Sequence, residues 1–506
     1  MTARTIMFQG TGSDVGKSVL TAALCRILAR DGYEVAPFKS QNMSLNSFIT
    51  RKGKEMGRAQ AFQAEAARVI PRVEMNPVLL KPNADDNSQV ILAGKPHKNM
   101  TAREYFNKQK QAEEVIATSL EKLKNNYQVL VLEGAGSPAE VNLREYDLVN
   151  MRIARMARAP VILIASIEKG GVFADIVGTL ELLTEEERKR IKGIIINKFY
   201  GAKERFSSGV EFIEEYTGKP VLGVIPYFSE MNLPEEDSLA RKTFGAEDYQ
   251  IDIAVIDLPH ISNFTDFDFL AAEPRTRVRY LKDPAVLKKP DLLIIPGSKN
   301  TVGDLNYLYQ TGMGAKIKEM YEKQVPIVGI CGGYQMLGQK IKDPRGIEIG
   351  GQKIKGLGLL EIETTLQPEK ITSQVEAYCN AELPFLKGDY RLKGYEIHQG
   401  KTERKSGVKS VFKLMRKGSE QVVNDGAHSK DYQCWGTYLH GVFDNDNFRR
   451  DLINYLRQKK GLSPLAEETT SSRQQREQAY EKFAEFVYDN LNMKLVKKII
   501  FQGEEI

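Results

Sequence analysis

A cysteine flanked by glycines is the residue of this chain best suited to act as a nucleophile. Gly329, Cys331 and Gly333 form a G-x-C-x-G pattern directly after the apolar run Pro326–Ile330. With serine at its centre, this spacing marks a strained strand-to-helix turn that projects the nucleophile and frees the next backbone N–H for an oxyanion. Cys331 is therefore predicted to attack an acyl carbon, with the amide of Gly332 as an oxyanion donor.

A thiolate nucleophile needs a base nearby, and His440 is the strongest candidate among the five histidines. It lies between the strand-like run Trp435–Leu439 and Gly441, in the same part of the chain as Cys331. A lone histidine is more often structural than catalytic. The prediction for His440 therefore depends on its pairing with the cysteine turn.

A second pattern that could do chemistry is the glycine-rich run GTGSDVGKS near the N-terminus. It is one residue longer than the usual G-x-x-x-x-G-K-[ST] phosphate loop, and a glycine-rich helix cap is the alternative. In a phosphate loop, backbone N–H groups receive phosphate oxygens, the lysine reaches the outer phosphates and the hydroxyl ligates Mg²⁺. The residues predicted to bind ATP are Gly10, Thr11, Gly12, Ser13, Gly16, Lys17 and Ser18, and Ser18 is also a predicted metal ligand.

The elements that must position these residues alternate short apolar runs with helical patterns such as Ser18–Asp31, which is typical of parallel β-α units. The first series of runs is Thr5–Gln9, Glu34–Phe38, Gln128–Leu132, Pro160–Ala165, Gly193–Asn197 and Val221–Ile225. A second series is Ile251–Asp257, Asp291–Ile295 and Pro326–Ile330. The fold class predicted is α/β, with two doubly wound, mostly parallel sheets and a helical C-terminal tail.

Changes in the pattern of apolar and polar residues divide the chain into four parts. We predict a nucleotide domain over residues 1–230, a polar linker over 231–250, a thiol domain over 251–456 and a tail over 457–506. The tail has apolar residues at helical spacing and is predicted to pack as one amphipathic helix. These apolar residues are Tyr480, Phe483, Phe486 and Val487.

Composition limits the classes of function. The net charge of +6 is small for 506 residues and is spread out, so nucleic acid is not an expected partner. Four cysteines without C-x-x-C spacing indicate neither a disulfide framework nor a zinc site. The absence of a leader-like segment and of a long apolar run predicts a cytoplasmic protein with no membrane partner. A homo-oligomer is compatible with the sequence.

The first domain resembles dethiobiotin synthetase and its relatives, whose loop has the pattern G-T-x-[ST]-x-V-G-K-[ST]. Pro37-Phe38-Lys39 and the E-G-A-G run at residues 133–136 are similar to further motifs of that family. The resemblance implies that Lys39 lies near the reacting carboxylate and γ-phosphate and that Glu133 ligates Mg²⁺. It also implies that Asn197 contacts the adenine edge, although an asparagine that caps a strand or turn stays open.

The second domain resembles the class I glutamine amidotransferases in its cysteine turn, in the run Tyr438–Gly441 and in the run Pro296–Thr301. The resemblance implies that Cys331 attacks the side-chain amide of glutamine, forms a glutamyl thioester and releases ammonia. The amide of Gly332 and one from the Gly297-Ser298 loop would bind the oxyanion.

One position departs from the pattern of that family. Most members carry His-x-Glu, but Val442 stands where the glutamate belongs. The imidazole would then be held by a backbone carbonyl or by a displaced acid, for which Glu396 and Asp444 are the candidates. The loss of an orienting acid predicts a sluggish glutaminase when the synthetase site is empty.

Joined in this order, the two domains resemble the cobyric acid synthase family over nearly the whole chain. The most specific segment is Lys39–Ser47, in which Lys39, Gln41, Asn42 and Asn46 are the expected substrate contacts. The resemblance implies ATP-, Mg²⁺- and glutamine-dependent amidation of a corrin in cobalamin biosynthesis. The expected targets are the b, d, e and g carboxylates of adenosylcobyrinic acid a,c-diamide, with adenosylcobyric acid as the product.

Two alternatives remain open at this point. The sister family, cobyrinic acid a,c-diamide synthase, joins the same two domains but acts on other carboxylates, and the Lys39–Ser47 segment favours the first reading. The other alternative is a ParA/MinD-like nucleotide switch with an inactive amidotransferase domain. The intact turn around Cys331 argues against a switch.

Overall fold

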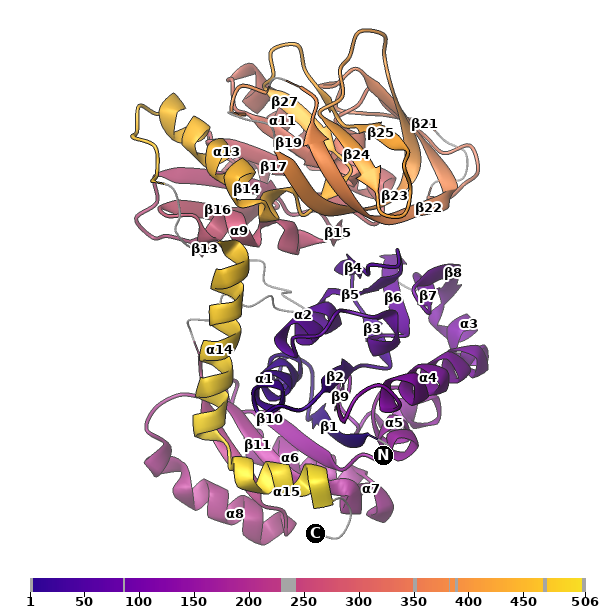
Figure 1. Ribbon diagram of the computed structural model, residues 1–506, viewed down its shortest axis with the longest axis vertical. Helices are drawn as coiled ribbons and strands as arrows, with labels where there is room; N and C mark the ends of the chain where they lie inside the picture. Colours follow the sequence, from indigo (N-terminus) through magenta and orange to yellow (C-terminus); the bar gives the residue numbers. More distant parts are fainter. Residues whose placement is uncertain are drawn as a thin grey trace.

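The computed structural model describes residues 3–84, 87–228, 243–348, 353–381, 383–386, 390–466 and 471–502. Two α/β domains are stacked along the long axis of the molecule, with the first domain below the second in the view of Figure 1. Most of the predicted linker lies outside the described residues. Its last part does not, and Phe244–Gly245 forms an edge strand, β13, of the second domain.

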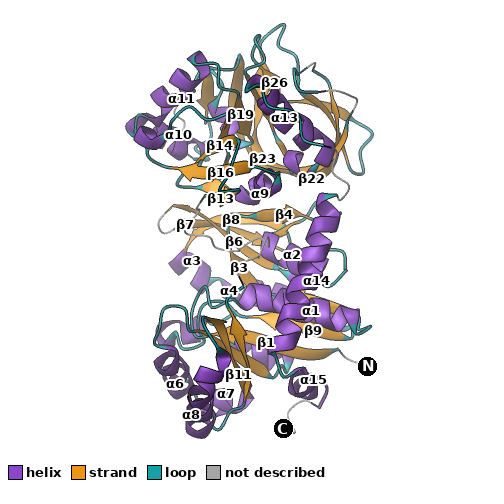
Figure 2. Ribbon diagram, turned by 90° about the vertical axis from the view of Figure 1, so that its left-hand side faces the viewer, coloured by secondary structure: helices purple, strands orange, loops and turns teal. Residues whose placement is uncertain are grey.

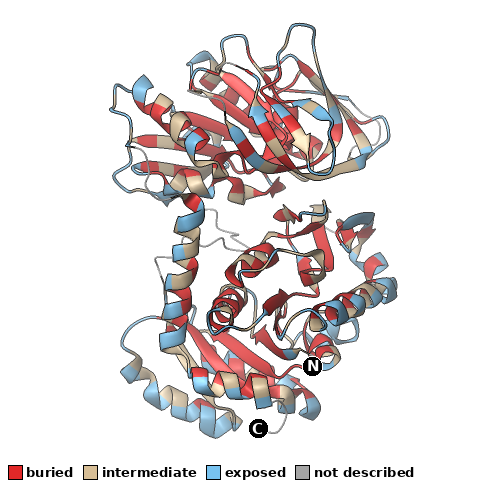
Figure 3. Ribbon diagram, in the orientation of Figure 1, coloured by how far each residue is buried: buried red, intermediate tan, exposed pale blue. Residues whose placement is uncertain are grey.

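The central sheet of the first domain contains all six apolar runs predicted from the sequence. Its order is β12-β11-β10-β1-β9-β2, and every neighbouring pair is parallel. The strands are nearly free of exposed side chains, as a sheet covered on both faces requires (Figure 3). Their bounds are β1 (Arg4–Gly10), β2 (Val35–Phe38), β9 (Val129–Glu133), β10 (Val161–Ser166), β11 (Ile191–Phe199) and β12 (Val221–Pro226).

Between β2 and β9 the chain adds a small sheet that the sequence did not predict. It faces the second domain in both side views of the molecule (Figures 1 and 2). The sheet has the order β3-β6-β7-β8, and the hairpin β4-β5 lies beside it. The strands are β3 (Gln41–Met43), β4 (Ser47–Ile49), β5 (Glu55–Gly57), β6 (Val78–Ala84), β7 (Asn87–Leu92) and β8 (Lys95–Thr101).

The second domain is built on a sheet of order β13-β16-β14-β17-β19-β27-β26, parallel except at its two edges. The three predicted runs are its strands β14 (Ile251–Ile256), β17 (Leu292–Ile295) and β19 (Ile327–Ile330). The other strands are β16 (Thr276–Leu281), β26 (Ala427–His428) and β27 (Cys434–Thr437). The fold class expected from the sequence is therefore confirmed for both domains.

A largely antiparallel sheet that the sequence did not predict covers this domain. Its long strands are β22 (Ile362–Cys379) and β23 (Arg391–Arg404), which extend toward the first domain. The short strand β28 (Leu439–His440) pairs with β23 and carries the predicted base. The remaining strands are β20 (Lys340–Lys342), β21 (Lys353–Lys355), β24 (Phe412–Arg416) and β25 (Val422–Asp425), and β15 (Ile261–Ser262) pairs separately with β18 (Gly297–Ser298).

Helices fill the connections between parallel strands. In the first domain they are α1 (Lys17–Arg30), α2 (Arg58–Ala66), α3 (Ala102–Asn107), α4 (Gln109–Lys124), α5 (Met151–Ala157), α6 (Val172–Leu182), α7 (Glu185–Arg190) and α8 (Ser207–Thr217). In the second they are α9 (Asp268–Ala272), α10 (Thr301–Gln310), α11 (Met313–Glu322), α12 (Gly332–Met336) and α13 (Asp446–Lys459). Among the helices of the described residues, none combines the length and apolarity needed to cross a bilayer.

The C-terminal tail forms two helices, α14 (Ser472–Asn490) and α15 (Met493–Gln502), so the prediction of a single helix is wrong. The chain turns between them, where the N–H of Asn492 donates to the carbonyl of Leu222 at 2.7 Å. Figure 1 shows α14, in yellow, descending from the second domain along the side of the first. Apolar residues of both helices enter the core of the first domain, together with α1 and strand β1.

Removing one tail side chain from that core should therefore destabilise the first domain. Phe483 is 4% exposed, and its ring lies 5.4 Å from that of Phe228. Phe483→Ala is expected to cost about 3–5 kcal/mol because it leaves a cavity. The check is urea unfolding of the full chain. Phe212→Ala, at a phenylalanine 46% exposed on α8, is the matched control, and an equal loss in both variants would contradict tail docking.

Candidate active sites

The glycine-rich run forms a turn between the end of β1 and the start of α1, as the phosphate-loop pattern predicts. Lys17 Nζ donates to the carbonyl of Gly12 at 2.7 Å and to that of Gly136 at 3.2 Å. Gly16 has a φ of 98°, and a Cβ there would lie 2.2 Å from Asn197 Nδ2. Only glycine fits this position, and the lysine charge sits at the mouth of the loop, where outer phosphates would bind.

Asn197, at the end of β11, is buried against the loop. Its Nδ2 donates to the carbonyl of Val15 at 2.8 Å. This bond braces the loop, which fits the structural alternative kept open for an asparagine at a strand end. The contact of Asn197 with adenine stays a prediction.

The two predicted metal ligands touch each other. The Oε1 atom of Glu133 accepts from Ser18 Oγ at 2.7 Å and from Lys39 Nζ at 2.9 Å, and the carboxylate is buried at the end of β9. A hydroxyl and a carboxylate oxygen beside a phosphate loop suit Mg²⁺, which takes its remaining ligands from phosphates and water. The residues therefore fit the ion, and within the described ranges no cluster of three acids, histidines or cysteines adds to them.

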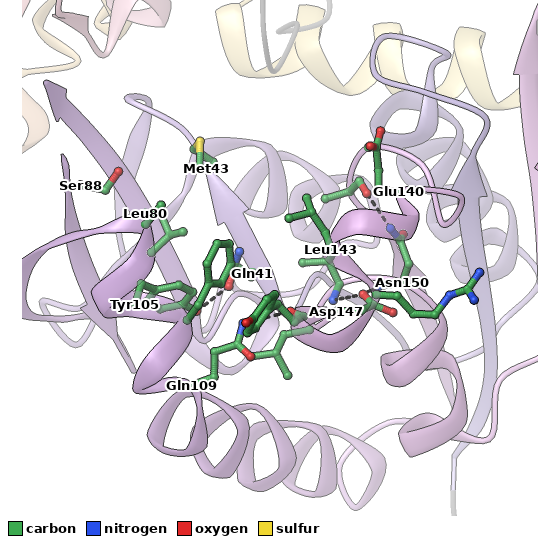
Figure 4. A pocket seen from close by; sticks show the side chains of 18 of the residues that line it. Gln41, Met43, Leu80, Ser88, Tyr105, Gln109, Glu140, Leu143, Asp147 and Asn150 are labelled. Carbon is green, nitrogen blue, oxygen red and sulfur yellow. Dashed lines mark hydrogen bonds between the residues drawn. The ribbon is translucent and has the colours of Figure 1, made fainter. Parts of the chain in front are cut away.

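A cavity of about 630 Å³ lies beside this site (Figure 4). Its walls are mostly apolar, with a few polar groups such as Gln41, whose Oε1 accepts from the Tyr105 hydroxyl at 2.5 Å. Gly136, which accepts from Lys17, is also part of the wall. The cavity and the expected outer phosphates are therefore neighbours, which is the geometry that transfer of a phosphoryl group to a bound carboxylate needs.

The segment predicted to contact substrate divides between three locations. Gln41 and Met43 line the cavity, whereas Asn42 lies on the opposite face of β3, because side chains alternate along a strand. Asn42 Nδ2 donates to Gln60 Oε1 at 3.1 Å, and Asn46 Oδ1 accepts from the N–H of Phe264 in the second domain at 3.1 Å. Asn42 thus braces Gln60 of α2, and Asn46 braces the domain interface, while the contact of each with substrate stays a prediction.

The backbone at Cys331 has the strain that the G-x-C-x-G pattern predicts, with φ 50° and ψ −107°. Its N–H donates to the carbonyl of Thr437 at 2.8 Å, which ties the nucleophile to the strand leading to His440. A Cβ on Gly333 would lie 2.0 Å from the carbonyl oxygen of Ile295, so this glycine is required. The turn is therefore held by strands on both sides.

His440 is oriented by Asp266, a residue that the sequence reasoning missed. Asp266 Oδ2 lies 2.7 Å from His440 Nδ1, and Asp266 Oδ1 accepts from the N–H of Gly441 at 3.3 Å. Burial alone would lower the pKa of His440, but Asp266 and the nearby Cys331 sulfur raise it to about 10. The imidazolium form is thus favoured, and because Nδ1 is held by Asp266, Nε2 is the ring nitrogen left to interact with the Cys331 sulfur and the reacting groups.

Neither acid expected from the sequence holds the imidazole. Glu396 accepts from Arg416 Nε at 2.6 Å, and together with His398 the arginine holds the pKa of Glu396 at about 2 despite burial. Asp444 makes no described hydrogen bond to the ring. Asp266 is the acid that takes the place of the glutamate missing at position 442. The expectation of a sluggish glutaminase depended on the loss of that carboxylate, so this reason does not apply.

The predicted oxyanion donors lie beside the ring and the sulfur. A Cβ on Gly332 would lie 2.8 Å from the amide nitrogen of Ser298, and one on Gly297 would lie 3.4 Å from His440 Cε1. The two backbone segments are therefore in close contact. This arrangement is compatible with two amides facing one oxyanion.

A small cavity of about 50 Å³ adjoins Cys331. Its wall includes Gln335, whose Nε2 donates to the hydroxyl of Tyr438 at 2.9 Å, and His398, whose ring stacks on Tyr438 at 3.7 Å between centroids. It also includes Lys81, which belongs to the first domain. The thiol site is therefore closed by side chains of both domains.

Two family descriptions match the chain. Residues 6–240 match the CobQ/CobB/MinD/ParA nucleotide binding domain, and residues 252–448 match the CobB/CobQ-like glutamine amidotransferase domain. Together with the two sites, these matches define a glutamine-dependent ligase. The combined pattern agrees with the resemblance found in the sequence motifs.

Relatives match over almost the full length. The cobyric acid synthase of Yersinia enterocolitica is 48% identical over 507 residues, covering 99% of this chain and 98% of the relative. That of Limosilactobacillus reuteri is 52% identical over 506 residues, covering 99% of both. The adenosylcobalamin biosynthesis bifunctional protein CobDQ of Leptospira interrogans is 46% identical over 98% of this chain and 57% of its own length. The chain belongs to the cobyric acid synthase family.

Proposed function

We propose that this protein amidates the b, d, e and g carboxylates of adenosylcobyrinic acid a,c-diamide, using ATP and glutamine, and yields adenosylcobyric acid. The observation that carries the proposal is the position of the large cavity. Gly136 in its wall accepts a hydrogen bond from Lys17 of the phosphate loop, and strand β6 contributes residues to the walls of both this cavity and the thiol cavity. One substrate pocket thus adjoins both the activating and the nitrogen-supplying chemistry.

In the first domain, Lys17 and the loop amides would bind the outer phosphates of ATP, and Ser18 and Glu133 would hold Mg²⁺. Bound ATP supplies the phosphoryl group that turns a corrin carboxylate into an acyl phosphate, a far better electrophile. Lys39, now paired with Glu133 at 2.9 Å, lies where it can stabilise charge on the transferring group. Gln41 and the apolar wall orient the corrin.

In the second domain, the Cys331 thiolate attacks the side-chain carbonyl carbon of glutamine. The amides of Gly332 and of the Gly297-Ser298 loop receive the oxyanion, and the His440 imidazolium, held by Asp266, gives its proton to the leaving ammonia. Water then hydrolyses the glutamyl thioester to glutamate. The ammonia displaces phosphate from the activated corrin carboxylate and forms the amide.

The closed interface supports the delivery of ammonia as a free base. In water at neutral pH most ammonia is protonated and cannot attack, so release inside a shielded site preserves the nucleophile. Hydrogen bonds cross the interface around the thiol site, including the Ser47 N–H to Asn263 Oδ1 at 3.1 Å and Thr372 Oγ1 to the Gly53 carbonyl at 3.0 Å. These contacts hold the two domains together at this point.

Mass spectrometry of the corrin after incubation tests the proposal. With adenosylcobyrinic acid a,c-diamide, ATP, Mg²⁺ and glutamine, we expect four successive products, each with one OH replaced by NH2. Omitting ATP or chelating Mg²⁺ should stop the series. A corrin that stays unchanged with both glutamine and ammonium as nitrogen donors would refute the proposed reaction.

A further inference from the structure

Two lysines from different domains share one carboxylate beside the thiol cavity. Lys81, on β6 of the first domain, lies 3.0 Å from Glu55 Oε1, and Lys370, on β22 of the second, lies 2.6 Å from Glu55 Oε2. The side chains of Glu55, Lys81 and Lys370 are 0%, 4% and 7% exposed. Both lysines are therefore satisfied by a buried partner, and the trio locks the interface next to Cys331.

Two further charged groups, Lys299 and Glu348, line the same cavity. Within the part of the chain that the structure describes, neither Lys299 nor Glu348 forms an ion pair. Burial and the charge of Lys81 lower the pKa of Lys299, while burial raises the pKa of Glu348, whose Oε2 accepts from the N–H of Val302 at 2.8 Å. Both side chains are half-buried, and each lowers the cost of a charge on the other, so a ligand between them that carries a charge of each sign would meet an opposite charge at both ends.

The thiol cavity therefore offers one cation, one anion and a nucleophile. An α-amino acid with a side-chain amide presents the complementary set: a carboxylate, an ammonium and an electrophilic carbon. Lys81 makes the end of the cavity near Lys299 more positive, which favours the carboxylate there. The Cys331 sulfur is close enough to Lys299 to affect its pKa.

We propose that Lys299 binds the α-carboxylate of glutamine and Glu348 its α-ammonium, in a pocket that Lys81 of the first domain completes. The proposal rests on the glutaminase role given to Cys331 above. Lys299 and Glu348 are then specificity-determining residues, and Lys81 is a positioning residue that acts through the potential at Lys299. The amidotransferase domain alone holds an incomplete glutamine site.

Strand β6 separates this pocket from the large cavity. Leu80 and Pro82 line the large cavity, whereas Lys81, between them, points to the other face and lines the thiol cavity. The next strand repeats the pattern, since Ser88 and Val90 line the large cavity while Gln89 accepts from Lys370 at 3.2 Å. Strand β6 thus contributes to the walls of both pockets, and β7 lines the large cavity and contacts Lys370.

The test compares L-glutamine with L-glutaminamide, which replaces the α-carboxylate by a neutral amide. Lys299→Met should lower kcat/KM for glutamine about 10- to 100-fold, chiefly through KM, and leave hydrolysis of L-glutaminamide nearly unchanged. Lys299→Arg should restore most of the preference for the carboxylate. Lys81→Met should weaken glutamine binding by a smaller factor, and Lys289→Met, at an exposed lysine, should change neither substrate.

Calorimetric binding of both compounds to a Cys331→Ala protein separates this proposal from the proposed function. A preference for binding glutamine that disappears with Lys299→Met supports the pocket. If the native protein hydrolyses neither compound, that result refutes the role of Cys331 but not the pocket. A Lys299→Met protein that loses both compounds equally, or that keeps the full preference for glutamine, overturns the proposal.

Discussion

Replacing Cys331 with alanine is expected to abolish glutamine-dependent amidation while amidation with ammonium continues. The Cys331 sulfur is the only atom of the protein proposed to form a covalent bond with glutamine, so kcat/KM for glutamine should fall by at least about a thousandfold. The phosphate loop and the large cavity lie in the other domain and do not depend on the sulfur. The measurement is corrin amide formed with each nitrogen donor at saturating ATP.

Cys379→Ala is the matched control, because Cys379 is half-buried at the end of β22 and lines neither cavity. This variant should use both nitrogen donors normally. Full glutamine use by the Cys331→Ala protein would refute the thiol assignment. Loss of activity with both donors would indicate that the substitution disturbs the domain interface.

Asp266→Asn should be the second most damaging change. The asparagine keeps the size of the side chain but removes the charge that holds His440 in its protonated form and correct orientation, so glutamine-dependent turnover should fall by about 10³- to 10⁴-fold. Asp266 raises the pKa of His440, and its removal lowers that pKa. If the imidazolium donates to ammonia, activity is lost as pH rises through this pKa, so the alkaline limb of the pH profile should move to lower pH.

Asp444→Asn is the control that distinguishes Asp266, which contacts His440 in the structure, from Asp444, which was a candidate from the sequence. It should reduce turnover far less than Asp266→Asn and leave the alkaline limb in place. Equal losses in the two variants would show that Asp266 does not orient the imidazole. Ammonium-dependent amidation, measured in parallel, reports whether either protein is misfolded.

The elements that sequence patterns predicted well are those whose signal is local. Each parallel strand is a short apolar run, and the loops around Lys17 and Cys331 each contain a glycine at which a side chain would clash with its neighbours. Such features are encoded within about ten residues, and the nine predicted runs all became strands.

The elements that were missed depend on contacts between distant residues. Asp266 lies 174 residues before the histidine it orients, so no spacing connects them. The only available signal was its position shortly after the predicted strand Ile251–Asp257, at the edge of a parallel sheet where functional residues gather. The antiparallel strands β22 and β23 alternate polar and apolar residues so weakly that their pairing across the domain was not visible.

The Lys39–Ser47 segment shows the same limit inside a motif that was correctly recognised. Its resemblance to one family identified the enzyme and set Lys39 near the γ-phosphate, yet gave Gln41, Asn42 and Asn46 a single role. The fold places Lys39 against Glu133, Gln41 in the wall of the large cavity and Asn46 at the interface with Phe264. Side chains alternate between the two faces of a strand, and the chain turns within a few residues, so neighbouring residues of one motif can reach different sites.

The return of α14 and α15 to the first domain has a consequence for biosynthesis. A ribosome releases the first domain's strands early, but the helices that cover one side of its core emerge only after the whole second domain has been made. The nucleotide-binding domain is therefore the first to be synthesised but can complete its core only when the end of the chain has been made. Throughout elongation, the apolar side of α1 stays open to chaperones or to other nascent chains, so folding depends on how quickly translation ends.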